Sequence, residues 1–358
     1  MSRVPEVKLH KLRLQNFRNY ALKEWEFSEG TLVVGENGVG KSNLLEGIVL
    51  LARGTSFRAG RIEEMVKWDG EVARVKARVT TENTVDLEIV LTRGEVGGEK
   101  APKTRYLVNG VTRRRMDFAG KLVVVLFRPE DLLLVEGSPG ERRDWLDEVL
   151  SGVDREYLRS LLAYEKALRR RNKILDLIRE GEVGRTQLAF WDGLLVKHGT
   201  ELTNKRRDLV EAVNQYWQKA GNNLSLEYDA SGISEARLAQ YKNEEVAAGY
   251  TLVGPHKDEL IFKSSTSSTS SRSSTSNNLA TYGSRGEQRM AVLWLKMAEL
   301  QFVESRLGER PVLLLDDIFS ELDEVHRRMV VGLTQKQQTI MTATEVVGKI
   351  GKMEVVRL

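Results

Sequence analysis

The sequence has no cysteine, and only four of its 358 residues are histidine. A chain without thiols has no disulfide framework, no thiolate nucleophile and no thiolate metal site, and so few imidazoles argue against zinc catalysis. No run of 18 apolar residues occurs, and the N-terminal segment lacks the uninterrupted apolar stretch of a signal peptide. We therefore expect a cytoplasmic protein without a membrane partner.

An excess of one charge sign is also lacking. The 55 Lys and Arg residues oppose 51 Asp and Glu residues, which leaves a formal charge of +4. That excess is too small to indicate a nucleic-acid partner by itself. The apolar fraction of 41% is enough to bury a sizeable core, and 358 residues exceed one typical domain. We expect one large α/β domain with an inserted lobe, or two domains.

The N-terminal segment changes its hydrophobic period at a glycine-rich stretch. Apolar and polar residues alternate from Val7 to Val34, which predicts three strands, the last of them buried. Apolar positions then recur at helical spacing from Asn43 to Leu51. The segment between them, residues 35–42, is therefore predicted to join a strand to a helix.

This segment fits the pattern G-x-x-x-x-G-K-[ST], in which glycines let backbone N–H groups converge on phosphate oxygens at a helix N-terminus. Lys41 is predicted to reach the β- and γ-phosphates, and Ser42 is predicted to ligate Mg²⁺. We interpret the segment as a binding site for ATP and Mg²⁺. Its residues are Gly35, Glu36, Asn37, Gly38, Val39, Gly40, Lys41 and Ser42.

Two further apolar runs, Lys121–Phe127 and Pro311–Leu315, show no alternation and suit strands that are covered on both faces. We assign both to a central sheet. The second run is followed by Asp316 and Asp317. Asp316 is predicted to hold the metal together with Ser42, and Asp317 to polarise the attacking water. The alternative is that the paired acids cap the next helix.

The remaining periodicity predicts two further substructures. Alternation in residues 71–92 and 105–108, followed by the hairpin turn Asn109-Gly110, predicts an antiparallel β subdomain beside the nucleotide site. From Asp144 to about Leu224 the period is helical, with a short glycine-containing break at residues 181–184, and this predicts an inserted helical lobe.

These patterns divide the chain. We expect residues 1–143 and 250–358 to form a P-loop ATPase head, and residues 144–249 to form the helical lobe. The tract 264–278 is almost pure Ser and Thr, with nothing to bury, and is expected to be a flexible surface loop.

A third motif, Ser284-Arg285-Gly286-Glu287, opens an amphipathic helix. Ser and Gly at a helix N-terminus form an anion site, and the alternative is a capping box between Ser284 and Glu287. The order of P-loop, this motif and the paired acids resembles the head of ATP-binding-cassette ATPases. The resemblance implies that Ser284, Gly286 and Glu287 form a signature acting in trans, on the γ-phosphate held by a second copy.

Longer stretches resemble the RecF family of recombination-repair proteins. The matching residues are 14–20, 35–46, 127–132, 136–139, 142–147, 254–260, 283–289, 314–317 and 319–323. The resemblance implies an α/β fold, namely an ABC/SMC-type P-loop ATPase head with an antiparallel β subdomain and a short helical lobe in place of a long coiled coil.

The same resemblance implies a function in DNA repair, DNA replication and the SOS response. Such a protein dimerises on ATP, clamps DNA at single-strand gaps, and promotes RecA loading together with RecO and RecR. Its hydrolysis of ATP is slow and DNA-dependent, and resets the dimer.

Several residues acquire roles only through the resemblance. Arg18 and Asn19 are placed over the nucleotide, the alternative being a solvated strand end. Asp323 is placed in a D-loop that crosses the dimer interface, the alternative being an acid that complements a helix dipole. Thr344 stands where many cassette ATPases have a switch histidine. Glu287 stands where Gln is common, which predicts weaker ATP-driven dimerisation because it adds negative charge near the phosphates.

DNA contact needs positive side chains, and four clusters supply them. A run of charge can also be a solvated face. No base-reading motif is visible, so we expect DNA to be recognised through its backbone and junction shape. The clusters are residues 113–115, 142–143, 169–171 and 205–207.

Two other functions are open. An SMC-like ATPase with nuclease activity would need an added carboxylate cluster, for which the chain leaves no room after Leu358. An SMC-like scaffold would dimerise under nucleotide control without a repair-specific role. Retention of Asp316 and Asp317 favours hydrolysis over purely structural nucleotide binding.

Overall fold

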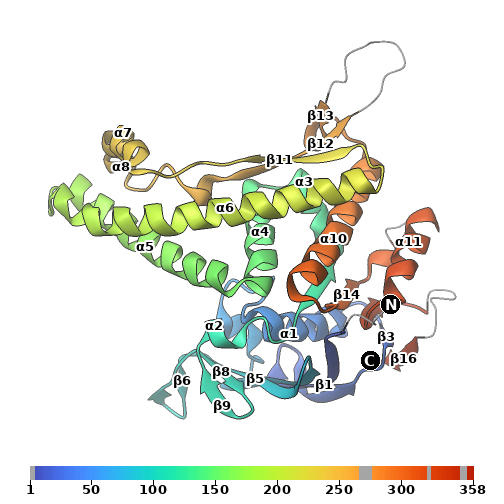
Figure 1. Cartoon of the computed structure of the whole chain (residues 1–358). Helices are drawn as coiled ribbons and strands as arrows, with labels where there is room; N and C mark the ends of the chain where they lie inside the picture. The colour runs from blue at the N-terminus through green and yellow to red at the C-terminus, as the bar shows by residue number, and fades with distance from the viewer. Residues whose placement is uncertain (1–4, 266–275, 321–323, 347–352) are drawn as a thin grey trace, which may run out of the picture. The chain divides into compact units, whose positions relative to one another are not determined.

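The computed structural model describes residues 5–265, 276–320, 324–346 and 353–358, and the chain divides into two compact units (Figure 1). Unit 1 comprises residues 1–131 and 303–358, and unit 2 comprises residues 132–302.

The boundaries of unit 2 differ from the helical lobe expected over residues 144–249. Strand β11 (Leu224–Asp229) pairs with β12 (Glu259–Ser265), so residues beyond 249 complete a sheet begun before it. Helix α10 (Arg285–Leu307) contributes Ala291, Leu295 and Ala298 to the apolar core of unit 2. The helical period could not reveal these long-range contacts.

A parallel five-stranded sheet lies in unit 1, in the order β10-β14-β15-β3-β16. Every residue of β3, β10, β14 and β15 is buried, which confirms the prediction of buried strands in a central sheet. The strands are β3 (Gly30–Val34), β10 (Val124–Phe127), β14 (Val312–Asp316), β15 (Thr339–Ala343) and β16 (Glu354–Arg357).

The predicted antiparallel subdomain is a six-stranded sheet in the order β2-β1-β4-β5-β8-β9. Asn109 and Gly110 both have positive φ, and Val108 pairs with Val111 across them, which is the predicted two-residue hairpin. One core joins both sheets of unit 1 to helix α1 (Lys41–Arg53). The strands are β1 (Lys8–Phe17), β2 (Tyr20–Glu26), β4 (Val72–Thr80), β5 (Thr84–Thr92), β8 (Thr104–Val108) and β9 (Val111–Arg113).

Smaller elements complete unit 1. They are η1 (Ile62–Met65), β6 (Glu95–Val96), β7 (Glu99–Lys100), α2 (Arg115–Phe118), η5 (Ile318–Ser320) and α11 (Glu324–Thr334). The segment η2 (Pro129–Leu132) runs across the boundary between the units.

Unit 2 is mainly helical, as predicted, and its two longest helices, α5 (Arg155–Arg179) and α6 (Ala189–Lys219), pack along each other (Figure 1). The Asp154 carboxylate caps α5 by accepting from the N–H groups of Glu156 and Tyr157. Other elements are α3 (Leu133–Glu136), α4 (Pro139–Val153), η3 (Arg185–Leu188), α7 (Glu235–Gln240), α8 (Lys242–Ala248), η4 (Pro255–Lys257), β13 (Ser276–Asn278) and α9 (Leu279–Tyr282).

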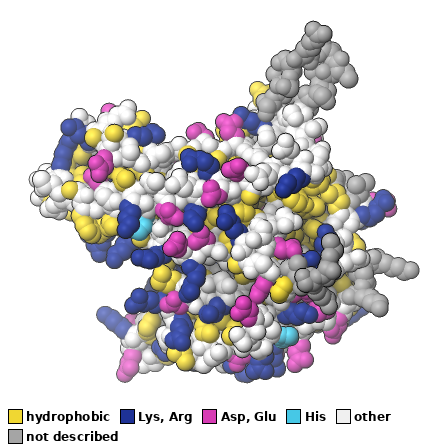
Figure 2. Space-filling model, viewed as in Figure 1, with side chains coloured by type: hydrophobic (Ala, Val, Ile, Leu, Met, Phe, Trp, Pro, Cys, Tyr) yellow, Lys and Arg dark blue, Asp and Glu magenta, His cyan; other side chains and the backbone are white. Residues whose placement is uncertain are grey.

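The Ser/Thr tract begins and ends in strands, because residues 264–265 belong to β12 and residues 276–278 to β13. Its centre, residues 266–275, lies outside the described residues. Within the described part of the chain, no helix combines the length and apolarity needed to cross a membrane. Figure 2 shows side chains of both charge signs interspersed over the viewed face.

Candidate nucleotide-binding site

The glycine-rich segment connects β3 to α1, as the sequence predicted. Gly38 and Gly40 have φ of 83° and 118°, in the left-handed region that favours glycine. A Cβ atom on Gly40 would lie 2.8 Å from the Tyr20 hydroxyl and 2.8 Å from Nδ2 of Asn19. A side chain at this position would therefore force the loop away from the β1–β2 turn.

The start of helix α1 carries no acidic side chain. Gly40 at the N-cap has no side chain, and the first turn contains no acidic residue. The first N–H groups of a helix lack intrahelical acceptors and carry the positive end of its dipole. Ser42 lies half-buried in this first turn. The arrangement fits a phosphate ligand.

Lys41 is buried within the loop. Its Nζ donates hydrogen bonds to the carbonyl oxygens of Gly35 (2.6 Å) and Glu36 (3.0 Å), and the residue is only 7% exposed. These bonds hold the ammonium group against the same loop whose N–H groups are predicted to surround the phosphates. Both hydrogen-bond acceptors of Lys41 thus belong to the glycine-rich loop itself.

Asp316 ends β14, at the same edge of the parallel sheet as the loop after β3. Parallel strands present their carboxyl ends at one edge, and β15 lies between these two strands. The Thr342 hydroxyl of β15 donates to Oδ1 of Asp316 at 2.7 Å, and both residues are buried. This bond fixes the orientation of the carboxylate predicted to hold the metal.

Asp317 follows in a constrained backbone conformation. Its φ is 49°, which is uncommon for a residue other than glycine. Its N–H donates to the Thr342 carbonyl oxygen and hydroxyl oxygen, each at 3.2 Å. Thr342 thus contacts both predicted acids. The sequence analysis singled out Thr344 instead, which is exposed.

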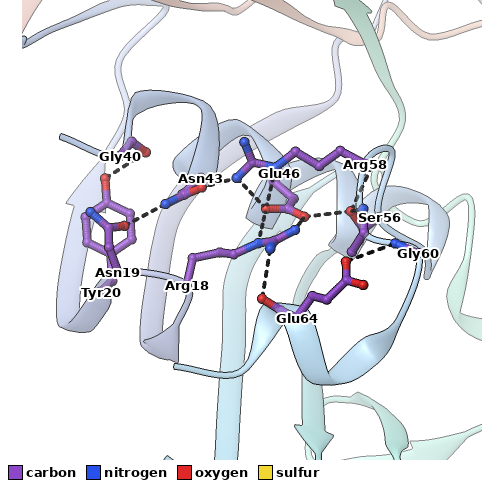
Figure 3. A network of polar contacts seen from close by, with 11 residues as sticks. Arg18, Asn19, Tyr20, Gly40, Asn43, Glu46, Ser56, Arg58, Gly60 and Glu64 are labelled. Carbon is purple, nitrogen blue, oxygen red and sulfur yellow. Dashed lines mark hydrogen bonds and ion pairs between the residues drawn. The ribbon is translucent and has the colours of Figure 1, made fainter. Parts of the chain in front are cut away.

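The β1–β2 turn lies against the glycine-rich loop (Figure 3). Asn19 donates from Nδ2 to the Val39 carbonyl (2.8 Å) and accepts at Oδ1 from Asn43 of α1 (2.7 Å). The Tyr20 hydroxyl donates to the Gly40 carbonyl at 3.0 Å, and burial raises the pKa of Tyr20 to about 12. Asn19 is therefore a support of the loop, and its contact with nucleotide stays a prediction.

Arg18 points toward a buried carboxylate that the sequence analysis did not single out. Its Nε and Nη2 donate to both oxygens of Glu46 at 2.8 and 2.6 Å, and Arg58 and Ser56 donate to the same group (Figure 3). Burial alone would raise the pKa of Glu46, but the bonds from Arg18, Ser56 and Arg58 outweigh it and lower the pKa. The sequence signal for Glu46 was a carboxylate amid buried apolar residues of α1.

Ser284 and Glu287 form the capping box named above as an alternative. The N–H and hydroxyl of Ser284 donate to Oε2 of Glu287 at 2.8 and 2.7 Å, and the Glu287 N–H donates back to the hydroxyl at 3.3 Å. These bonds, chiefly that from the hydroxyl, lower the pKa of Glu287. A Cβ on Gly286 would meet nothing within 4 Å. The role of this motif in trans stays a prediction, and Asp323 lies outside the described residues.

Comparison with known proteins gives consistent relatives. The family described as RecF/RecN/SMC N terminal domain matches residues 8–348. A DNA replication and repair protein RecF from Oceanobacillus iheyensis is 33% identical over 365 residues, covering 95% of this chain and 94% of the relative. Another RecF, from Chloroflexus aurantiacus, is 38% identical and covers 94% of this chain and 93% of the relative.

Solved structures are similar over the same length. The recombination mediator protein RecF-ATPrS of the RecFOR pathway matches with a TM-score of 0.85 at 28% identity, covering 100% of this chain and 98% of that one. The corresponding RecF-ATP structure has a TM-score of 0.83 at 29% identity, covering 97% and 95%. An Smc head bound to the C-winged helix domain of ScpA has a TM-score of 0.51 at 16% identity, covering 94% and 90%, and shares the fold alone. The predicted α/β head fold is confirmed.

Proposed function

The chain belongs to the RecF family of DNA replication and repair proteins, within the wider group of RecF, RecN and SMC heads, and from this premise we propose that it is an ATP-binding recombination mediator of the RecFOR pathway. One observation carries the proposal. A glycine-rich loop with Lys41 and Ser42 follows strand β3, and the buried carboxylate of Asp316 ends strand β14 of the same parallel sheet. The chain that carries both matches RecF over its whole length.

The residues divide the binding of ATP among them. Backbone N–H groups of residues 38–42 and the α1 N-terminus would hold phosphate oxygens, and the Lys41 ammonium would exchange its carbonyl partners for them. Ser42 and Asp316 would hold Mg²⁺. Bound ATP with its metal supplies the negative charge that a second copy can recognise.

A second copy would complete the site. Ser284, Gly286 and Glu287 at the start of α10 would face the γ-phosphate of the partner copy, with Asp323 at the interface. We propose that ATP thereby drives homodimerisation, that the dimer clamps DNA at single-strand gaps, and that it acts with RecO and RecR in RecA loading. Asp317 would position the attacking water, and slow, DNA-dependent hydrolysis would release the dimer.

Sedimentation velocity tests the proposal. The wild type and Lys41→Met are compared with ATP, without nucleotide, and with a non-hydrolysable ATP analogue, each in the presence and absence of a gapped duplex. We expect the wild type to become dimeric with either nucleotide and the variant to remain as it is without nucleotide, because the variant lacks the phosphate-binding ammonium group. A wild type whose mass ignores nucleotide would refute ATP-driven dimerisation and leave the scaffold function.

A further inference from the structure

The basic clusters noted in the sequence do not each form one charged surface. Arg171 and Arg206 are both 2% exposed and lie in ion pairs inside unit 2. Arg171 binds Glu245 (2.7 Å) and Asp192 (2.6 Å). Similarly, Arg142 is 8% exposed and donates hydrogen bonds to both carboxylate oxygens of Glu259. Each of the three clusters that lie on helices therefore contains an arginine that is buried in ion pairs. The sequence analysis considered DNA contact and a solvated face, and neither describes these buried arginines.

Subtracting these buried arginines leaves an exposed row on α5. Arg159, Lys166, Arg170 and Lys173 are all exposed and lie on this one helix. At about 100° per residue, the four positions fall within an arc of about 60°, and Arg155 lies in the same arc toward the start of the helix. From Arg159 to Lys173 the row is about 21 Å long at a rise of 1.5 Å per residue. Lys and Arg side chains gather below α5 in Figure 2.

The row carries unneutralised charge. Among the described residues, Arg159, Lys166, Arg170 and Lys173 have no carboxylate within ion-pair distance, whereas neighbouring Arg169 pairs with Glu165 at 3.8 Å. At 100° per residue, the acidic side chains of α5 lie outside the arc of the row, with Glu156 nearest at about 40° from its edge. They are Glu156, Glu165 and Asp176. A helix face on which positive side chains outnumber the single bordering carboxylate, Glu156, fits a polyanion.

A polar cavity adjoins the N-terminal end of the row. It has a volume of about 250 Å³ and is lined by Glu156, Arg159, Ser160, Lys197, His198 and Glu201. Burial lowers the pKa of His198, and the charges of Lys197 and Arg159 lower it further. Glu201 lies 3.9 Å from Lys205, which offsets part of its charge. The positive side chains of the cavity continue the row from α5 onto α6.

We propose that this row, Arg159, Lys166, Arg170 and Lys173 with Lys197 beside the cavity, binds the phosphate backbone of duplex DNA. The inference rests on the proposed DNA-binding function and names the surface that performs it. A helix presents its charges in a fixed line, and about 21 Å corresponds to about 6 base pairs at 3.4 Å each, so the row matches a stiff duplex.

A single strand is a poorer fit for this face. Proteins that bind single strands combine positive charge with aromatic side chains on which bases stack. The two aromatic residues of α5, Tyr157 and Tyr164, are 0% and 2% exposed. Helix α5 itself therefore offers phosphate contacts without an exposed aromatic side chain, and contacts of this kind carry no base specificity.

The test compares two triple variants of the full chain that remove the same charge. The first is Lys166→Gln/Arg170→Gln/Lys173→Gln, on the row. The control, Lys219→Gln/Arg237→Gln/Lys242→Gln, removes two lysines and one arginine from other parts of unit 2. Binding to a blunt duplex and to a single strand of equal length is measured with ATP at several salt concentrations, and sedimentation confirms that both variants still dimerise with ATP.

For the row variant, we expect the negative slope of log affinity against log salt concentration for the duplex to become shallower by about 2.7, which is about 0.9 for each of three lost phosphate contacts. For the control variant, we expect little change in this slope. Equal slopes for wild type and row variant would overturn the inference while leaving ATP-driven dimerisation intact. An equally large loss for the single strand would overturn the assignment to duplex. A wild type that binds no duplex would instead refute the proposed function.

Discussion

Replacing Thr342 with valine isolates the bond that orients Asp316. Valine has nearly the same shape as threonine and lacks the hydroxyl that donates to Oδ1 of Asp316 at 2.7 Å and accepts from the Asp317 N–H at 3.2 Å. Thr342 is 1% exposed and Asp316 is 8% exposed, so water replaces the lost donor poorly. A hydrogen bond to a charged group contributes about 1.5–3 kcal/mol. We expect Thr342→Val to lower the free energy of unfolding by about 2 kcal/mol.

The same change is expected to weaken the metal site. Partners that orient a metal-binding carboxylate typically contribute about 10- to 100-fold in metal affinity. We therefore expect the Mg²⁺ concentration that half-saturates binding of a fluorescent ATP analogue to rise at least about tenfold in Thr342→Val. The assay is a Mg²⁺ titration at fixed nucleotide concentration, with urea unfolding measured in parallel.

The matched control is Thr339→Val in the same strand. Thr339 is also fully buried, but its hydroxyl donates to the Gln337 carbonyl at 3.1 Å, away from the acids. We expect this variant to lose about 1 kcal/mol of stability and to keep the Mg²⁺ dependence of the wild type. If both valine variants required the same Mg²⁺ concentration as the wild type, Asp316 would not hold the metal as proposed.

Three further predictions concern other sites. Burial lowers the pKa of His256 to about 4, so the unfolded chain takes up a proton before the folded chain as the pH falls below 6.5. The free energy of unfolding of the wild type should therefore fall by about 2 kcal/mol between about pH 7 and pH 5, as measured by urea unfolding. His256→Gln should lose less stability over the same pH range. Equal losses would contradict this. Gly40→Ala should abolish binding of the ATP analogue, because its Cβ would clash with Asn19 and Tyr20; unchanged binding would show that the loop adapts. Glu287→Gln should tighten the ATP-bound dimer in sedimentation, and an unaltered dimer would exclude repulsion by Glu287.

Features set by neighbouring residues were predictable from the sequence. The P-loop, the strand before it and the helix after it follow from a spacing pattern and a change of period, and the structure confirms that the glycine-rich segment joins this strand to this helix. The capping box of Ser284 and Glu287 is equally local. Asp316 could be placed at the sheet edge because an apolar run of strand length precedes it.

Contacts between distant segments were not predictable. Thr342 meets Asp316 only because β15 pairs with β14, and nothing in either segment specifies that pairing. Tyr20 reaches Gly40 through the β1–β2 turn for the same reason. The extent of unit 2 depends on the pairing of β11 with β12, which the helical period between them conceals.

Charge clusters were ambiguous for a different reason. Adjacent arginines on a helix point about 100° apart, so a run such as Arg169 to Arg171 necessarily spans several environments. Arg170 is exposed, whereas Arg171 is buried against Glu245. Helical spacing could have separated the two groups once the buried face of α5 was known from Tyr157 and Tyr164.

The most direct test of the central claim is the affinity for a gapped duplex with and without ATP, in the wild type and in Lys41→Met, over a salt series from about 50 to about 200 mM. The account predicts that ATP strengthens binding by the wild type alone and that this binding falls steeply with salt. Affinity that is indifferent both to ATP and to Lys41 would contradict an ATP-driven clamp and leave a nucleotide-stabilised scaffold.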